Sequence, residues 1–140
     1  MRRVVVDPGV LISALITPLG PPAEIVRAVR DRQLALIVSP HLLAELLAVL
    51  QREKFRRYVT VDEAEQYVAG LASHAEAVGD PSSPERIARD AKDDYLIALA
   101  REAAADAIVS GDADLLVLTD LEPRVVSPSD LVAELAQEST

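Results

Sequence analysis

The sequence predicts an α/β fold with a mainly parallel sheet that helices cover on both faces. Four short apolar runs, rich in β-branched residues, have the length of buried strands and stand at residues 3–6, 34–38, 107–109 and 124–126. Helical segments separate these runs, and short apolar strands that alternate with helices indicate parallel pairing. Ser-Pro pairs at 39–40 and 127–128 give the usual order of a helix N-cap and a first helical residue.

The expected order of elements is β-α-α-β-α-α-α-β-α-β-α. The helices are predicted over residues 10–16, 23–33, 40–50, 60–78, 93–105, 113–118 and 128–137. The proline-rich segment 17–22 separates the first two helices, and segment 79–84, rich in Pro and Ser, is the clearest loop. Asp93 or Asp94 is expected to open the helix that follows this loop.

Length and composition limit the class of protein. At 140 residues the chain fits one domain, and we expect residues 1–140 to form it. The absence of cysteine excludes thiolate zinc sites and thiol nucleophiles, and it fits a reducing, cytoplasmic environment. No apolar run approaches the ~20 residues of a membrane span, so no membrane contact is expected.

The net charge of −9 is unevenly distributed along the chain. Residues 1–57 carry nine basic and five acidic side chains, a net charge of +4, whereas residues 58–140 carry five and eighteen, a net charge of −13. An acidic half concentrates carboxylates that can bind cations, and a basic half can hold a polyanion. Chance drift of surface charge is the simpler explanation of the same asymmetry.

Several acidic residues are expected at one rim of the sheet. Asp7 ends the first strand and Asp112 follows the third, and reactive sites of such folds lie beyond the carboxyl ends of parallel strands. Glu45 interrupts an apolar helical stretch, where an acid is costly to bury unless it is paired, protonated or bound to a cation. Asp93 and Asp94 stand in the first turn of a helix that could begin on the same rim.

Converging carboxylates of this kind point to a divalent cation. Acids at close range raise each other's pKa, and one or two divalent ions resolve the conflict. Mg²⁺ and Mn²⁺ prefer hard oxygen ligands, and a two-metal site can hydrolyse a phosphodiester without cysteine or histidine. Each acid alone is explained as well by a turn or an N-cap. Their joint position on one rim is what favours a metal site.

Four segments of the chain carry a family resemblance. They are VVVDPGVLISAL at the start, VSPHLLAELLAVLQREKF after the second strand, RDAKDDYLIALA before the third strand and IVSGDADLL after it. In this order and spacing they resemble the PIN-domain family, and specifically its branch of VapC-like ribonucleases, the toxins of toxin–antitoxin pairs. The resemblance covers essentially the whole chain. It implies a three-layer α/β/α sandwich with a four- to five-stranded sheet and a ribonuclease site that depends on Mg²⁺ or Mn²⁺.

The resemblance also implies an acidic quartet that binds metal and catalyses hydrolysis. Carried over by position, the quartet is Asp7, Glu45, Asp94 and Asp112. Asp94 is preferred to Asp93 because the family's acid directly precedes a stretch like YLIA. Adjacent helical residues are ~100° apart, so both are not expected to reach one ion. Which of the two faces the metal stays open.

Three residues are expected to support the quartet without being its ligands. Ser110 and Asp114 are candidates for indirect or water-mediated support, and Asp93 for the same role or for a helix cap. The chain departs from the family after its first acid, where Pro8 and Gly9 replace the usual Thr or Ser and Asn. Loss of such a supporting side chain can cost ~10–100-fold in metal affinity or activity.

Two alternatives to an active nuclease follow from the same residues. The Pro8-Gly9 departure is compatible with a catalytically weakened PIN module that binds RNA or a protein partner without cleavage. A phosphotransfer receiver, another acidic α/β protein, is poorly supported because the only lysines, Lys54 and Lys92, do not follow the third or fourth strand.

A basic cluster follows the third predicted helix, and it is the candidate RNA-binding surface. Its members are Arg52, Lys54, Arg56 and Arg57, with the aromatic residues Phe55 and Tyr58 between and after them. Such a surface can grip phosphates and stack a base, although cations also favour the C-terminal end of a helix for its dipole alone. By resemblance the partners are an RNA substrate, a small antitoxin protein and a second copy of the chain in a homodimer.

Overall fold

Five parallel strands form one sheet in the residues that this computed structural model describes, 1–82 and 85–138. The strands are β1 (Arg2–Val6), β2 (Leu34–Val38), β3 (Glu76–Ala77), β4 (Ala107–Val109) and β5 (Arg124–Val126). Their order across the sheet is β3-β2-β1-β4-β5, and every neighbouring pair is parallel. The predicted α/β class with a parallel sheet is therefore confirmed.

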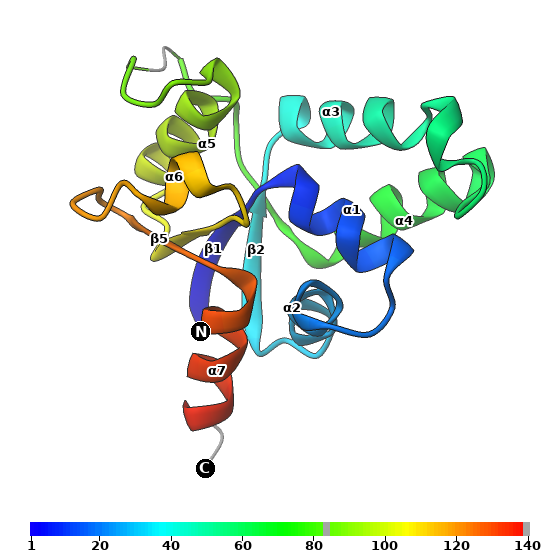
Figure 1. Cartoon of the computed structure of the whole chain (residues 1–140), viewed down its shortest axis with the longest axis horizontal. Helices are drawn as coiled ribbons and strands as arrows, with labels where there is room; N and C mark the ends of the chain where they lie inside the picture. The colour runs from blue at the N-terminus through cyan, green and yellow to red at the C-terminus, as the bar shows by residue number, and fades with distance from the viewer. Residues whose placement is uncertain (83–84, 139–140) are drawn as a thin grey trace.

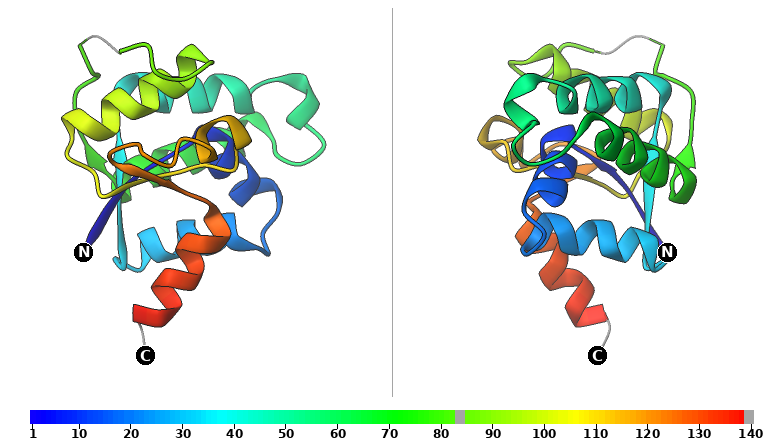
Figure 2. Two further views of the ribbon diagram at one scale, coloured as in Figure 1. Left: turned by 60° about the vertical axis from the view of Figure 1, so that its left-hand side comes forward. Right: turned by 90° about the vertical axis from the view of Figure 1, so that its right-hand side faces the viewer.

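Helices cover the two faces of this sheet. They are α1 (Pro8–Ile16), α2 (Pro21–Arg30), α3 (Pro40–Leu50), α4 (Val61–His74), α5 (Ala91–Glu102), α6 (Ala113–Leu116) and α7 (Pro128–Glu138), with a short 3-10 helix η1 (Glu53–Phe55) after α3. Figure 1 shows α1 to α4 on one side of the sheet and α5 and α6 on the other. The C-terminal α7 packs against α2 and projects past the end of the sheet where both termini lie (Figure 2).

The strands are apolar without alternation because both faces of the sheet are covered. Val4, Val5 and Val6 of the central strand β1 are fully buried, as are Ile108 and Val109 of β4. They belong to one hydrophobic core that extends from the sheet into the helices on both sides. In the described residues no single helix has the length and apolar composition to cross a membrane. Helices α1 and α2 have that length and composition only when taken together, and the chain bends by 97° between them.

Several predicted helix boundaries differ from the structure, and two of the differences matter here. The helix predicted over 60–78 ends at His74, and Glu76 and Ala77 instead pair with β2 as the edge strand β3. The helix expected to open at Asp93 or Asp94 begins at Ala91, and its N-cap is Asp90, whose carboxylate accepts from the Lys92 N–H at 2.9 Å.

Candidate metal and nucleic-acid site

The carboxyl ends of β1 and β4 bring two predicted acids together. Val6 pairs with Val109 at the last position of both strands, and Asp7 and Ser110 follow them. Ser110 is fully buried, its Oγ donates to Asp7 Oδ2 at 2.9 Å, and the same oxygen accepts from the Asp112 N–H at 3.0 Å. The Ser110 hydroxyl therefore connects the carboxylate of Asp7 to the backbone of Asp112.

Asp7 and Asp112 are also helix caps, so their ordinary structural explanation holds as well. Asp7 Oδ1 accepts from the Gly9 N–H at 3.1 Å at the start of α1, and Asp112 Oδ1 accepts from the Asp114 N–H at 2.9 Å at the start of α6. A carboxylate has about four lone-pair sites, so a cap leaves room for a cation. The caps orient both side chains, and Asp114 contributes through its backbone.

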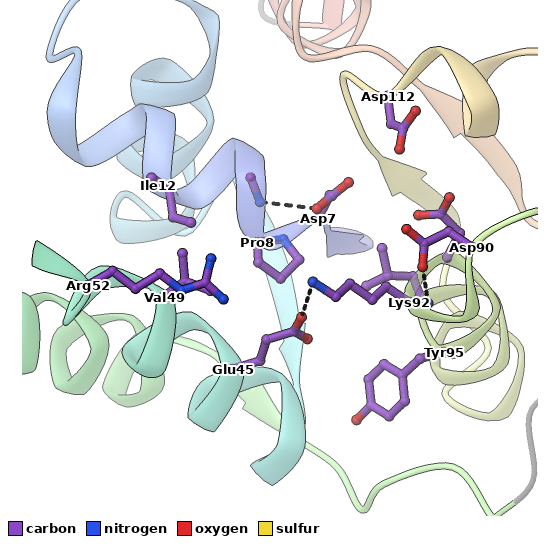
Figure 3. Close-up of a pocket in the computed structure, with 13 residues that line it drawn as sticks. Asp7, Pro8, Ile12, Glu45, Val49, Arg52, Asp90, Lys92, Tyr95 and Asp112 are labelled. Carbon is purple, nitrogen blue, oxygen red and sulfur yellow. Dashed lines mark hydrogen bonds and ion pairs between the residues drawn. The ribbon is translucent and has the colours of Figure 1, made fainter. Parts of the chain in front are cut away.

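Glu45 reaches the same rim from α3. Its side chain is 23% exposed and lies between two nitrogen-bearing side chains: Lys92 Nζ is 3.7 Å from Oε1, and His41 Nε2 is 3.9 Å from Oε2. Figure 3 shows Lys92 extending from α5 across the hollow towards Glu45 on the opposite wall. The buried acid expected from the sequence is thus partly compensated by Lys92.

Asp93 and Asp94 point in different directions, and it is Asp93 that faces the other acids. Asp93 lines the hollow that Asp7, Glu45 and Asp112 also line. Asp94 lines a separate surface depression, and its Oδ1 accepts from the N–H groups of two residues in the preceding segment, Ile87 and Ala88, at 2.9 and 2.7 Å. The preference for Asp94 over Asp93 therefore does not match the geometry. Asp94 instead holds the segment that leads into α5.

The environment of Asp93 is unfavourable to its charge. The residue is only 4% exposed, and its Oδ2 is buried with no hydrogen-bond partner among the described residues. Burial, first of all, raises the pKa of Asp93 to about 6, and the negative charges of Asp112, Asp7, Asp90 and Asp114 act in the same direction, in that order. A bound cation would satisfy a buried carboxylate oxygen of this kind.

The hollow between these residues has a volume of about 240 Å³. Besides the predicted acids it is lined by Asp90, Lys92 and Tyr95 of the α5 region and by Arg52 at the end of α3. Figure 3 shows Asp90 and Asp112 on the α5–α6 side and Arg52 on the α3 side. Sequence reasoning missed Asp90, Lys92 and Tyr95 here. The helical phase of α5 is the signal that could have found them.

Tyr95 is fixed at the edge of the hollow by hydrogen bonds. Its hydroxyl donates to Asp80 Oδ1 at 2.6 Å and lies 2.5 Å from Ser39 Oγ, and its ring packs against that of His41 with centroids 4.7 Å apart. Burial, first of all, raises the pKa of Tyr95 to about 12, so the hydroxyl stays protonated and keeps donating. The network joins the entry of α5 to the N-terminus of α3.

The basic cluster is divided by the structure. Arg52 lines the hollow and makes no ion pair within the described residues, whereas Lys54 and Arg57 lie outside it, each over an aromatic ring. Arg56 turns inward and donates to the carbonyl oxygens of Leu50 and Arg52 at the end of α3. The tentative RNA-binding role of Arg56 therefore does not fit its position, because its guanidinium completes a helix end.

The acids fit a divalent cation in chemistry, with water as part of its coordination. In the described part of the chain no three carboxylate or imidazole side chains lie close enough to surround one ion. Mg²⁺ commonly binds through one or two carboxylates and keeps several waters, so an open acidic hollow suits it. The unpartnered Asp93 oxygen supplies the reason for such an ion to bind there.

Comparison with known proteins assigns the family. The PIN-domain family model matches residues 3–114. This chain belongs to the PIN-domain family. An uncharacterized protein of Methanocaldococcus jannaschii, MJ1680, is 30% identical over 141 residues, which cover 94% of this chain and 90% of the relative. PIN domains are generally nucleases and typically depend on divalent metal, and the acidic rim is where this PIN domain places its carboxylates.

Solved structures agree with the PIN fold. PAE2754 from Pyrobaculum aerophilum superposes with a TM-score of 0.64 at 16% identity, covering 98% of this chain and 90% of that one. VapBC2 from Rickettsia felis, solved bound to a DNA fragment from its promoter, gives a TM-score of 0.63 at 10% identity, covering 89% and 98%. At these identities the likeness concerns the fold alone.

Proposed function

We propose that this PIN domain is an endoribonuclease that depends on Mg²⁺ or Mn²⁺ and hydrolyses RNA phosphodiesters with water as the nucleophile. The observation that carries the proposal is the convergence of Asp7, Glu45, Asp93 and Asp112 on one hollow at the carboxyl ends of the strands. These four residues would hold the metal directly or through its bound waters, with Asp93 in the role that the sequence favoured for Asp94.

Each side chain has a distinct task in this proposal. Asp93 would give its unpartnered Oδ2 to the cation, and Asp7 and Asp112, which Ser110 connects, would hold the same ion. Glu45 would complete the site or orient the attacking water. A divalent cation held by these residues would lower the pKa of a coordinated water and stabilise negative charge on the phosphate.

The departure at Pro8 and Gly9 does not disorganise the first acid. Gly9 donates its N–H to Asp7 Oδ1, and Ser110 donates to Asp7 Oδ2, so both carboxylate oxygens are oriented without the usual asparagine. Pro8 occupies the first position of α1, where an N–H would have no helical partner. This geometry supports an active enzyme over a weakened binding module.

Arg52 is the proposed contact for an RNA phosphate next to the cleaved bond. It is exposed and lines the hollow opposite Asp90 and Asp112, so a phosphate held at the acids would lie between a cation site and a guanidinium. Lys54 and Arg57 extend this basic surface outside the hollow. Single-stranded RNA suits such a surface, because its backbone can bend into a narrow site.

We also propose a small antitoxin and a second copy of the chain as protein partners. The Rickettsia felis neighbour is VapBC2, and this likeness supports an antitoxin that restrains this chain as a toxin. Exposed apolar side chains such as Tyr58 and Val61 at the α3–α4 turn are available for a homodimer contact. A sedimentation mass equal to the monomer's 15.0 kDa at working concentration would contradict the dimer.

The test is cleavage of a labelled single-stranded RNA in Mn²⁺ or Mg²⁺, with the wild type, Asp93→Asn, Asp94→Asn and an EDTA control. We expect Asp93→Asn and EDTA each to reduce cleavage by at least about 100-fold, more than the loss of a supporting residue. Asp94→Asn is the matched control: it removes the neighbouring charge, and we expect activity to remain while stability falls.

Two outcomes would change the proposal. If Asp94→Asn abolishes cleavage and Asp93→Asn does not, Asp94 replaces Asp93 as the metal-binding acid of α5. If the folded wild type binds Mn²⁺ yet cleaves no RNA, the weakened binding module becomes the better account.

A further inference from the structure

Lys92 occupies a position that is unfavourable for a cation within its own helix. It is the second residue of α5, at the positive end of the helix dipole, where a cation is unfavourable. Its side chain is 69% exposed, yet it extends to within 3.7 Å of Glu45 on α3 instead of into solvent (Figure 3). Two helices on opposite walls of the hollow are thus joined by one ion pair.

The surroundings of Lys92 explain why its ammonium lies there. Asp7, Asp90, Asp93 and Asp112 line the same hollow, and among its described lining residues Lys92 and Arg52 are the two cations. Of these two, Lys92 is the one that pairs with an acid of the hollow. Attraction to the carboxylates therefore outweighs the unfavourable helix dipole.

We propose that Lys92 is a tethered competitor of the divalent cation: its ammonium pairs with Glu45 in the metal-free protein and leaves when the metal binds. This inference rests on the proposed metal site. An exposed ion pair of this length is weak, worth a few-fold in affinity, so a divalent ion displaces it readily. Lys92 is then a positioning residue that keeps Glu45 directed into the hollow before the metal arrives.

Displacement gives the freed ammonium a second use. A flexible lysine at the rim, released from Glu45, is able to pair with a phosphate oxygen of RNA bound at the same hollow. The metal and the RNA would then favour the same position of Lys92. By thermodynamic reciprocity each ligand would tighten the binding of the other.

The first experiment measures Mn²⁺ affinity by calorimetry without RNA. Lys92→Gln removes the competitor, and we expect Mn²⁺ to bind about fivefold more tightly. Lys92→Arg keeps the charge, and we expect it to bind Mn²⁺ as the wild type does. Lys54→Gln is the matched control for metal affinity, because it makes the same substitution at the only other lysine, outside the hollow. A change of less than about 1.5-fold (about 0.2 kcal/mol) in Lys92→Gln would overturn the proposal.

The second experiment tests whether Glu45 is the group for which lysine and metal compete. With lysine labelled by ¹³C at the ε carbon, the chain gives one side-chain signal for each of its two lysines. Addition of Mg²⁺ should shift the Lys92 signal and leave that of Lys54 in place, and Glu45→Gln should place the Lys92 signal near its metal-bound position from the start.

The outcomes separate this inference from the function on which it rests. A Lys92 signal that does not respond to Mg²⁺ in a protein that binds the ion contradicts the tethered competitor and leaves the metal site intact. A wild type that binds neither Mn²⁺ nor Mg²⁺ overturns the metal site and the role of Lys92 together.

Discussion

Charged groups are arranged differently at the two ends of the sheet. At the amino ends of β1 and β5, Arg2 and Arg124 share Glu134 of α7: Arg2 Nη1 lies 2.8 Å from Oε1, and Arg124 donates to both carboxylate oxygens at 2.5 and 3.0 Å. At the carboxyl ends, Asp93 is buried without a partner for Oδ2, and Arg52 makes no ion pair in the described residues.

The difference separates charge that stabilises the fold from charge that is available to a ligand. Paired groups such as Arg124 and Glu134 support each other's ionised state: their bond raises the pKa of the arginine and lowers that of the glutamate. The burial of Asp93 and the acids around it act in the opposite sense on its pKa. Residues with a strongly shifted pKa in a concave site are typical of functional sites, which supports the proposed role of the carboxyl end of the sheet.

The largest effect should come from the pH dependence that Asp93 gives to the metal-free protein. Its pKa rises from 3.8 to about 6 on folding, so the folded state binds the proton more tightly than the unfolded state. The contribution of protonated Asp93 to the free energy of unfolding is therefore complete below pH 3.8, and it is lost as pH rises through about 6. At ~1.4 kcal/mol per pKa unit, the change amounts to at most about 3 kcal/mol.

Asp93→Asn is the variant that isolates this contribution. In EDTA at about pH 7.5 we expect the variant to unfold at a higher temperature than the wild type, because it lacks the buried charge, and the difference should vanish near pH 4. Urea or thermal unfolding followed by circular dichroism measures both values. A wild type that remains the more stable protein at the higher pH would show that Asp93 is adequately solvated.

A smaller effect, on RNA binding, is expected from Arg52 at the carboxyl ends of the strands. Arg52→Gln should weaken the binding of single-stranded RNA to the catalytically inactive Asp7→Asn protein by about fivefold, and should reduce the salt slope by ~0.7 for one lost phosphate contact. Arg124→Gln removes the same charge at the amino end and should leave RNA binding unchanged. Fluorescence anisotropy over a range of salt concentrations measures both, and equal losses in the two variants would mean that only net charge matters.

Much of this arrangement follows from the sequence, for a physical reason. Buried parallel strands are continuous apolar runs, so β1, β2, β4 and β5 could be located. Asp7 and Asp112, which follow β1 and β4 closely in sequence, were therefore expected at the same edge of the sheet. A strand of two residues carries no such pattern. Glu76 and Ala77 pair with β2 because the chain passes along the edge of the sheet there. These two residues therefore fall within the helix predicted over 60–78.

The choice between Asp93 and Asp94 shows where sequence reasoning stops. Neighbouring helical residues differ by ~100° in direction, so the motif that favoured Asp94 could place the acid on α5 but not say which of the two residues faces the rim. Asp90 takes the cap that was expected of its neighbours, and Asp94 is used to hold the loop through Ile87. These outcomes depend on packing between segments distant in sequence, which local propensity does not contain.

The smallest effect tests the paired end of the comparison. Glu134→Gln breaks the bonds to Arg2 and Arg124, and for partly exposed pairs of this kind we expect a loss of about 0.5–1 kcal/mol, or roughly 2–4 °C in melting temperature. Because pairing lowers the pKa of Glu134 below 4.5, the contribution of Glu134 to stability is present above pH 4.5 and is lost as pH falls through the lower pKa of the folded state.

The pH dependence of this contribution is opposite in sign to that of Asp93. A titration of melting temperature with pH should therefore show Glu134→Gln merging with the wild type in acid, whereas Asp93→Asn departs from it in base, and Mn²⁺ affinity should be unaffected by Glu134→Gln. If both variants respond to pH in the same direction, the two ends do not differ in the use of charge, and the distinction between structural and ligand-binding carboxylates fails.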